Sequence, residues 1–374
     1  MSVADRVLIT GGAGFIGSHL ADALLARGYR VRILDNLSEQ VHGRSAAFPT
    51  YLAAEVETVN GDIRDRAAME RALANVDAVF HFASAVGVGQ SMYEIERYVD
   101  INNRGTAVLL ESLRRRPVAK LVVASSMSVY GEGLYEDAKG RACTPVPRSA
   151  EQMKSGVWDV FGDDGGALHP VATPEHKAPM PESIYALSKL DQEIMCLLFG
   201  RAYKLPVAAL RFFNVYGERQ ALANPYTGVL AIFAARYLNG KPVVIFEDGQ
   251  QRRDFVHVRD LADGCVLALE NPRACDAVYN IGSGDSCSIL EVAQRFGRVL
   301  GLEHLRPVVN STHRPGDIRN CFADITKARR ELQFRPRIAL ETGLAQLAEW
   351  LAGRSDEDHS ERATIELRHH GLLA

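Results

Sequence analysis

The sequence lacks the features that mark exported, metal-binding and membrane-spanning proteins. Its six cysteines stand at positions 143, 196, 265, 275, 287 and 321 and form no C-x-x-C pair. Disulfides and a zinc site are therefore not expected, and the thiols should be reduced. No apolar run approaches the ~20 residues of a membrane span, and no charged-then-apolar leader precedes the first strand-like run. These absences predict a cytoplasmic protein without a structural metal.

The chain also lacks an excess of either charge. Its 43 basic and 46 acidic residues give a formal net charge of −3. A protein that binds nucleic acid or an anionic membrane surface usually carries a marked basic excess. The charge therefore argues against both kinds of partner. The length of 374 residues allows a large core and one or two domains.

The first half of the chain alternates short apolar runs with amphipathic segments. The expected strands are residues 6–10, 30–34, 56–60, 78–82, 121–124 and 207–211, and expected helices include 18–27, 66–74 and 103–115. Near-continuous apolar strands separated by helices indicate a parallel sheet covered on both faces. With right-handed crossovers this predicts an α/β fold with a Rossmann-type doubly wound parallel sheet. Its ligand crevice would lie beyond the carboxyl ends of the strands.

A smaller mixed α/β lobe for the substrate is expected after this sheet. We predict a first domain over residues 1–212 and the smaller lobe over 213–353, with 253–285 partly returning to the first domain. Helical stretches at residues 228–239, 289–300 and 340–351 support the second lobe.

Two segments break the alternation. Residues 132–182 are rich in Gly, Pro and charge and are long for a loop, so we interpret them as an insertion over the active-site face, with disorder as the alternative. Residues 354–374 form a charged tail that should fray, although 364–373 could form a short docking helix.

A glycine-rich turn follows the first predicted strand. The run Thr-Gly-Gly-Ala-Gly-Phe-Ile-Gly at 10–17 leads from this strand into an apolar helix. Gly11 permits the sharp turn, Gly14 lets the backbone approach a pyrophosphate, and Gly17 lets the helix pack close to the strand. The anion would lie on free N–H groups at the helix N-terminus. The pattern predicts a dinucleotide site.

Acidic residues end the second and third predicted strands. Asp35 can accept hydrogen bonds from both ribose hydroxyls of an adenosine and would repel a 2′-phosphate, which favours NAD over NADP. Asn36 follows it without a positive charge, although Arg44 lies near enough in sequence to leave NADP open. Asp62 and Ile63 could meet the adenine. The alternative is that Asp62 only caps the next helix.

Tyr185 and Lys189 are candidate catalytic residues. Four residues apart on a predicted helix, they share one face. A free tyrosine has a pKa of about 10. A neighbouring ammonium and a positive nicotinamide should lower that value, which would let the phenol act as a base. The other two Y-x-x-x-K pairs begin at Tyr135, in the Gly-rich segment, and at Tyr237, near an expected helix end.

A third candidate lies at the end of an apolar strand. The run Leu-Val-Val-Ala-Ser-Ser-Met-Ser-Val-Tyr-Gly at 121–131 brings hydroxyl groups to the carboxyl edge of the sheet. Ser126 could hydrogen-bond both a reacting oxygen and Tyr185. The alternative is that these serines are turn residues only.

Together these motifs resemble the extended short-chain dehydrogenase/reductases, and within them the nucleotide-sugar epimerases and dehydratases. The matching segments, in order, are residues 10–17, 35–38, 81–83, 90–91, 125–131, 185–189, 211–217, 253–258 and 279–284. The chain resembles UDP-galactose 4-epimerases and, by its long insertion, dTDP-L-rhamnose 4-epimerases. This resemblance implies an NAD-dependent 4-epimerase acting on a UDP- or dTDP-linked sugar, with Tyr185 as catalytic base or acid, Lys189 as its partner and Ser126 completing the triad.

The resemblance also implies binding residues and an assembly. The implied cofactor contacts are Gly11, Gly14, Phe15, Ile16, Gly17, Asp35, Asn36, Asp62, Ile63, Phe82, Ala83, Asn102, Tyr185 and Lys189. The implied substrate contacts are Gln90, Ser91, Ser126, Asn214, Arg253, Arg314 and Asp317. Arginine forks suit phosphate oxygens. A homodimer through the helices at 103–115 and 188–199 is expected by the same similarity.

Departures from the family pattern bear on the reaction. Met127 and Ser128 stand where 4,6-dehydratases carry acids, which argues against dehydration. Val86 replaces a lysine that some 4-epimerases place near the nicotinamide, which bears on how firmly NAD is retained. The alternatives are a 4-ketosugar reductase that exchanges its cofactor, a decarboxylase or dehydratase, and a cofactor-sensing binding protein on the same fold.

Overall fold

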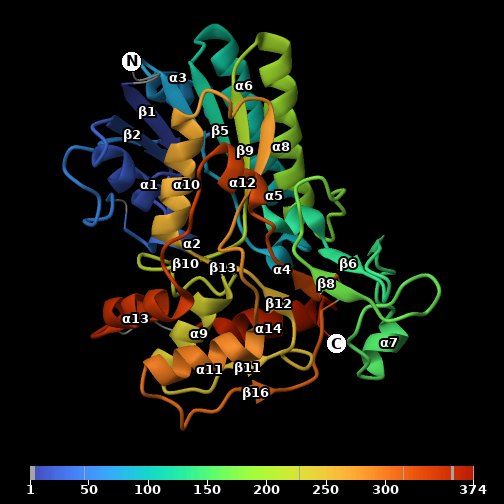
Figure 1. The fold of residues 1–374 in the computed structure, drawn as a ribbon. Helices are drawn as coiled ribbons and strands as arrows, with labels where there is room; N and C mark the ends of the chain where they lie inside the picture. The colour runs from blue at the N-terminus through green and yellow to red at the C-terminus, as the bar shows by residue number, and fades with distance from the viewer. Residues whose placement is uncertain (1–4, 46, 227, 315, 355–357, 374) are drawn as a thin grey trace.

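The computed structural model describes residues 5–45, 47–226, 228–314, 316–354 and 358–373. A large lobe holds the main sheet with helices on both sides, and a smaller lobe lies at one end of it (Figure 1). The segment that contains β6, β8 and α7 projects from the side of the smaller lobe.

Seven parallel strands form the main sheet, in the order β14-β9-β5-β4-β1-β2-β3. They are β1 Arg6–Thr10, β2 Arg30–Asp35, β3 Glu57–Asn60, β4 Ala78–His81, β5 Lys120–Ser126, β9 Val207–Phe212 and β14 Ala277–Ile281. From β1 the chain adds β2 and β3 on one side, and from β4 it adds β5, β9 and β14 on the other. The β1–β4 pair is therefore the topological switch point, where such folds place their ligand crevice. The predicted fold class is confirmed.

Helices cover both faces because successive strand residues point to opposite sides. Val7 and Ile9 face a core with α1 Phe15–Leu25 and α10 Val258–Glu270, whereas Leu8 faces a core with α3 Arg66–Ala72, α6 Gly105–Arg115 and α8 Ile184–Tyr203. Shorter helical segments lie in the connections: α2 Glu39–His42, α4 Val88–Ser91, α5 Ile95–Tyr98, a π-helix Val99–Arg104 and a 3₁₀ turn Met127–Tyr130.

The smaller lobe packs three helices around its own core: α9 Val229–Leu238, α11 Ile289–Val299 and α13 Leu340–Leu351. Short strands complete it, pairing β10 Asn214–Tyr216 with β13 Phe255–His257, β11 Val244–Ile245 with β16 Val308–Val309, and β12 Arg252–Arg253 with β15 Cys287–Ser288 and β17 Asn320–Cys321. Between these strands the chain returns to the large lobe through α10 and β14, against which α12 Thr326–Glu331 packs.

The segment 132–182 is folded rather than disordered. Its strands β6 Leu134–Glu136, β7 Ala142–Cys143 and β8 His169–Val171 form an antiparallel sheet, and a short helix, α7 Ala150–Lys154, follows β7. Tyr135, Val160 and Leu168 form a small core of its own. Backbone hydrogen bonds from Gly133 and Thr173 tie it to the chain around β17. It therefore packs as a small subdomain against the smaller lobe.

The tail forms a docked helix, α14 Ser360–His369, which begins four residues before the helix that the sequence predicted. Ala363 and Leu367 are buried, so this part of the tail is not frayed. Across the described residues, no helix has the length and hydropathy needed to cross a lipid bilayer.

Candidate active site

The three predicted catalytic residues lie at the carboxyl end of the main sheet. Ser183 caps α8 by accepting a hydrogen bond from the Ala186 N–H at 3.1 Å, which fixes the first turn that carries Tyr185. Lys189 follows one turn later, and only 9% of Tyr185 and 3% of Lys189 are exposed. Ser126 ends β5, the strand against which α8 packs. The structure thus brings these residues together, as the sequence predicted.

Burial controls the protonation of this pair. It raises the pKa of the Tyr185 phenol, against a smaller lowering by a hydrogen bond with Ser126. Lys189 donates to the Gln192 Oε1 at 2.7 Å, and burial lowers the pKa of its ammonium to about 8. In the protein without cofactor the pKa of this phenol is therefore raised rather than lowered, because desolvation is the largest cause. The second expected cause, the nicotinamide charge, requires bound cofactor.

A buried polar chain extends from Lys189 to the glycine turn. Gln192 Nε2 donates to the Thr106 Oγ1 at 2.8 Å, and Thr106 lies 3.0 Å from the His81 Nε2. The His81 Nδ1 lies 2.8 Å from the Thr10 Oγ1, at the start of the turn. Full burial lowers the pKa of His81 to about 3, with Lys189 adding to the effect, so this imidazole is neutral. The hydrogen-bonded chain that starts at the Lys189 ammonium thus consists of uncharged groups.

Sequence reasoning missed Gln192 and Thr106. The available signal was the i,i+3 spacing of Lys189 and Gln192 on one helix face. Nothing local to residue 106 indicates that its hydroxyl meets α8, because that contact joins segments 86 residues apart.

Asn102 lies within the π-helix and ties the loop after β4 to α8. Its side chain donates to the Ser188 Oγ at 2.9 Å and to the Ala85 carbonyl at 3.1 Å, and accepts from the Ala85 N–H at 2.7 Å. π-helical turns often occur at functional sites. The predicted cofactor residue Asn102 therefore also fixes the segment that carries Val86.

Close packing explains two glycines of the turn. Gly11 has φ +70°, and a Cβ there would lie 2.8 Å from the Ala83 backbone. At Gly17 a Cβ would lie 2.5 Å from the Gly11 carbonyl oxygen. At Gly14, which precedes Phe15 and Ile16 at the start of α1, the nearest atom to a Cβ is 3.5 Å away. The backbone at Gly14 is therefore open to a ligand.

The two acidic strand ends are fixed differently. Asp35 accepts from the Ala13 N–H at 3.0 Å and the Leu37 N–H at 2.9 Å, so its carboxylate faces the glycine turn. Asp62 accepts from Asn36 at 3.0 Å, and hydrogen bonds from Arg64 lower its pKa to about 2. The alternative that Asp62 caps the next helix is wrong, since Asp65 caps α3.

The remaining predicted cofactor contacts lie around the same turn. Phe82 and Ala83 follow β4, and both backbone N–H groups donate to the Thr10 hydroxyl at 3.2 Å. Ile63 is buried beside Gly105 at the start of α6. Arg44 pairs with Glu39 at 3.1 Å on the exposed surface. The residues predicted for NAD thus lie around the carboxyl ends of the central strands.

Ser91 is linked directly to α8, and Gln90 is linked to Tyr98 of α5. The Ser91 hydroxyl accepts from the Tyr185 N–H at 3.0 Å, and Gln90 accepts from the Tyr98 hydroxyl at 3.1 Å. Asn214, at the start of β10, has a buried Oδ1 with no hydrogen-bond partner among the described residues. Buried polar atoms are normally satisfied, so a ligand group is a reasonable partner for this oxygen.

The predicted phosphate-binding residues meet around one loop. Arg253 donates to the Arg319 carbonyl at 3.0 Å and also to the Ile318 carbonyl. Arg314 pairs with Asp317 at 3.1 Å and lies over the Phe246 ring at 5.3 Å. The structure therefore places both arginines along the 314–319 loop.

The insertion supports this loop, which sequence reasoning did not find. Arg148 donates to the Asp317 carbonyl at 2.6 Å and pairs with Glu247 at 2.9 Å. Arg319 pairs with the other oxygen of Glu247 at 3.2 Å. All three charged side chains are almost fully buried. The insertion thus braces the loop of Arg314 and Asp317 from outside.

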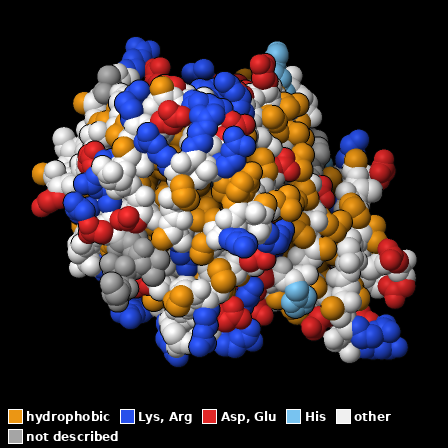
Figure 2. All heavy atoms as spheres, turned by 90° about the horizontal axis from the view of Figure 1, so that it is seen from above, with side chains coloured by type: hydrophobic (Ala, Val, Ile, Leu, Met, Phe, Trp, Pro, Cys, Tyr) orange, Lys and Arg blue, Asp and Glu red, His pale blue; other side chains and the backbone are white. Residues whose placement is uncertain are grey.

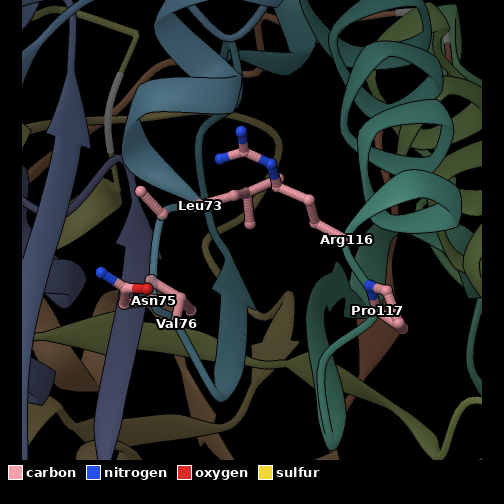
Figure 3. Close-up of a pocket in the computed structure, with 6 residues that line it drawn as sticks. Leu73, Asn75, Val76, Arg116 and Pro117 are labelled. Carbon is pink, nitrogen blue, oxygen red and sulfur yellow. The ribbon is translucent and has the colours of Figure 1, made fainter.

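No group of His, Cys, Asp and Glu in the described part of the chain is suited to hold a metal ion. A surface hollow lies elsewhere, between the loop after α3 and the loop after α6, where Arg116 reaches toward Leu73 (Figure 3). These loops precede β4 and β5, so the hollow lies at the amino ends of the strands, whereas Tyr185 lies at their carboxyl ends. It takes no part in the site.

Comparison with known proteins agrees with this geometry. The sequence model of the NAD dependent epimerase/dehydratase family matches residues 7–150 and 158–282. A dTDP-L-rhamnose 4-epimerase of Burkholderia thailandensis is 34% identical over 355 residues, which cover 94% of this chain and 96% of the relative.

Two solved structures share the fold over nearly their whole length. The UDP-glucose 4-epimerase of Thermotoga maritima with UDP-glucose is 31% identical, with a TM-score of 0.74 over 92% of this chain and 98% of that chain. The enzyme of the same name from Thermus thermophilus, in complex with NAD, is 30% identical, with a TM-score of 0.72 over 94% and 100%.

Proposed function

Because this chain belongs to the NAD-dependent epimerase/dehydratase family and is an NAD-dependent nucleotide-sugar 4-epimerase, we propose that Tyr185 performs its proton transfer on a UDP- or dTDP-linked sugar. The observation that carries the assignment is the placement of Tyr185 and Ser126 together at the carboxyl end of the sheet, next to the switch point. Relatives that bind UDP-glucose and that are named for dTDP-L-rhamnose support these two nucleotides.

The residues present fit NAD. The open backbone at Gly14 suits a pyrophosphate, and the Asp35 carboxylate lies beside the glycine turn, where it can take the adenosine ribose. Lys189 would hold the nicotinamide end, and Asn102 would fix the loop of Ala85 beside it. When bound, NAD would supply the hydride acceptor for C4 of the sugar and the donor for its re-reduction.

Tyr185, as the phenolate that a positive nicotinamide beside it would favour, takes the proton of the sugar 4-hydroxyl and later gives it back, while Ser126 orients the same oxygen. Arg253 and Arg314 hold the diphosphate, so that the 4-keto sugar can turn about its link and present its opposite face. Tight binding at the nucleotide and weak binding at the sugar are what this cycle needs.

The positions after Ser126 favour epimerisation over dehydration. Met127 and Ser128 are buried in the 3₁₀ turn and carry no carboxyl group. A 4,6-dehydration needs acid groups beside the sugar to move protons at C5 and C6. A net reductase would use the same three residues and would differ from an epimerase by a lasting consumption of NADH.

Incubation with a panel of UDP-, dTDP- and GDP-sugars tests the proposal. We expect NMR of the products to show inversion at C4 of one UDP- or dTDP-linked sugar, with no lasting change in NADH absorbance. Stoichiometric production or loss of NADH would instead identify a reductase. Loss of water or of carbon dioxide would identify a lyase.

The pH dependence should follow Lys189. The Lys189 cation is lost as the pH rises through about 8, so we expect activity to decline above that value.

The same titration affects stability. In the unfolded chain the Lys189 side chain keeps its proton up to a pH of about 10.5. The buried cation therefore costs stability below pH 8, and the cost disappears as the pH rises from about 8 to 10.5. Rate and unfolding profiles of the wild type and Lys189→Met measure both effects. A wild-type rate that stays flat across pH 8 would contradict the assignment.

We propose further that the protein is a homodimer that buries one face of α8. Leu187, Ile194 and Leu198 lie on one face of this helix and are 44–53% exposed. Seen from above, hydrophobic side chains gather in a band over the region of α6 and α8 (Figure 2). Such a patch usually marks an interaction site, and a second copy would cover it symmetrically.

Sedimentation velocity tests the homodimer. We expect a dimer for the wild type and for Arg201→Ala, which changes an exposed, ion-paired residue of the same helix. Leu198→Glu should give a monomer, because it would bury two carboxylates in the interface. A monomeric wild type would rule the homodimer out.

A further inference from the structure

The C-terminal helix α14 packs directly against α4, the short helix that carries Gln90 and Ser91. Leu367 is buried, and one of its methyl groups lies 2.9 Å from where a Cβ would stand at Gly89. One residue beyond the helix, the His370 ring stacks on Tyr93 with 4.3 Å between centroids and 10° between planes. The end of the tail therefore covers the outer side of α4.

A hydrogen-bonded cluster fixes the same contact. Glu366 accepts from the Tyr226 hydroxyl, which accepts from the Tyr93 hydroxyl at 2.8 Å, and the Tyr93 hydroxyl also lies 3.3 Å from the Glu366 carboxylate. Tyr226 in turn packs over Gly87, at the start of α4. One carboxylate thus joins the tail to the segment 87–93 and to the loop of the smaller lobe that contains Tyr226.

The other end of α14 is anchored on the smaller lobe. Arg236 of α9 donates to the Ser360 hydroxyl at 3.1 Å. Asp358, just before the helix, lies 3.6 Å from both Arg236 and Lys241. The helix therefore bridges α9 of the smaller lobe and α4 of the large lobe, across the end of the sheet where the site lies.

On its inner side α4 contacts the start of the catalytic helix. Ser91 accepts from the Tyr185 N–H at 3.0 Å. Gln90 accepts from Tyr98, whose ring meets the Tyr185 ring edge-on with 6.5 Å between centroids. Packed contacts thus run without interruption from Leu367 through Gly89 and Ser91 to Tyr185.

We propose that Leu367 and Glu366 are positioning residues, and that α14 holds α4 against α8 so that Tyr185, Gln90 and Ser91 meet the sugar in the right geometry. This inference rests on the proposed function of Tyr185. Among the described residues, these contacts join the tail to the segment 87–93, to Tyr226 and to α9. Its influence should therefore fall on the sugar end of the substrate and not on cofactor or nucleotide binding.

Leu367→Ala tests the proposal, with Ile365→Ala as a matched control because Ile365 lies on the same helix and is 65% exposed. We expect kcat/KM for the best sugar nucleotide to fall at least about tenfold in Leu367→Ala, since a small displacement of reacting groups can cost about 100-fold. Bound NAD and the Kd for UDP or dTDP alone should stay within twofold. Leu367→Met should restore most of the activity, and Ile365→Ala should match the wild type.

Hydrogen exchange gives a readout that does not depend on activity. In Leu367→Ala the amides of α4 and of the first turn of α8 should exchange faster, with those of the glycine turn unchanged. Equal exchange and equal kcat/KM in Leu367→Ala and Ile365→Ala would overturn the proposal. A wild type without epimerase activity would instead refute the proposed function, and the exchange data would still test the contact.

Discussion

Replacing Tyr185 with phenylalanine should lower kcat by about 10³-fold, within the range that loss of one acid–base group produces. The ring, its burial and its edge contact with Tyr98 are retained, so only the proton-carrying oxygen is removed. Steady-state rates on the sugar nucleotide that gives the highest activity measure this. The Kd for UDP or dTDP and the amount of bound NAD should change little, because Tyr185→Phe keeps the ring and leaves the other predicted contacts in place.

Tyr203→Phe is the matched control. Tyr203 ends the same helix and is 54% exposed, so its hydroxyl should be dispensable. Near-normal activity of Tyr185→Phe would show that the proton acceptor lies elsewhere. If Tyr185→Phe loses both its activity and its bound NAD, the site is misfolded instead.

Replacing Glu193 with alanine should destabilise the protein by about 3–5 kcal/mol, the usual cost of leaving one member of a buried ion pair alone. Glu193 accepts two hydrogen bonds from Arg211, at 2.6 and 3.0 Å, and both side chains are at most 5% exposed. The guanidinium also lies 4.6 Å from the centre of the Tyr130 ring. Without Glu193 this charge would remain buried between β9 and α8. Denaturant unfolding measures the change.

Arg201→Ala provides the comparison on the same helix. Its ion pair with Asp276 is about half exposed on both sides, so the loss should be below about 1 kcal/mol. Similar losses in Glu193→Ala and Arg201→Ala would mean that water or a shifted side chain compensates Arg211.

Features specified by a short stretch of chain were predictable. The strand at 6–10 arises from the consecutive apolar residues 7–9, and the glycine turn needs glycine at 11 and 17, where a Cβ would meet the backbone. Tyr185 and Lys189 could be placed on one face because helical geometry alone determines it. The docked helix of the tail was predicted four residues too late, since helix ends are weakly encoded.

Features created by long-range packing were not predictable. Arg148 meets Glu247 across 99 residues, and Leu367 meets Gly89 across an even longer stretch. The raised tyrosine pKa of the protein without cofactor was not predictable for the same reason. The sequence shows a lysine four residues away but not the amount of solvent removed around the phenol, and that removal dominates.

The neutral state of His81 limits how the site responds to acid. Its pKa near 3 means that mild acidification adds no proton to the imidazole between Thr10 and Thr106. An ordinary histidine would become cationic in that range and would repel both Lys189 and a positively charged nicotinamide. Burial, with the Lys189 charge adding to it, therefore keeps the imidazole neutral at this end of the site when the pH falls.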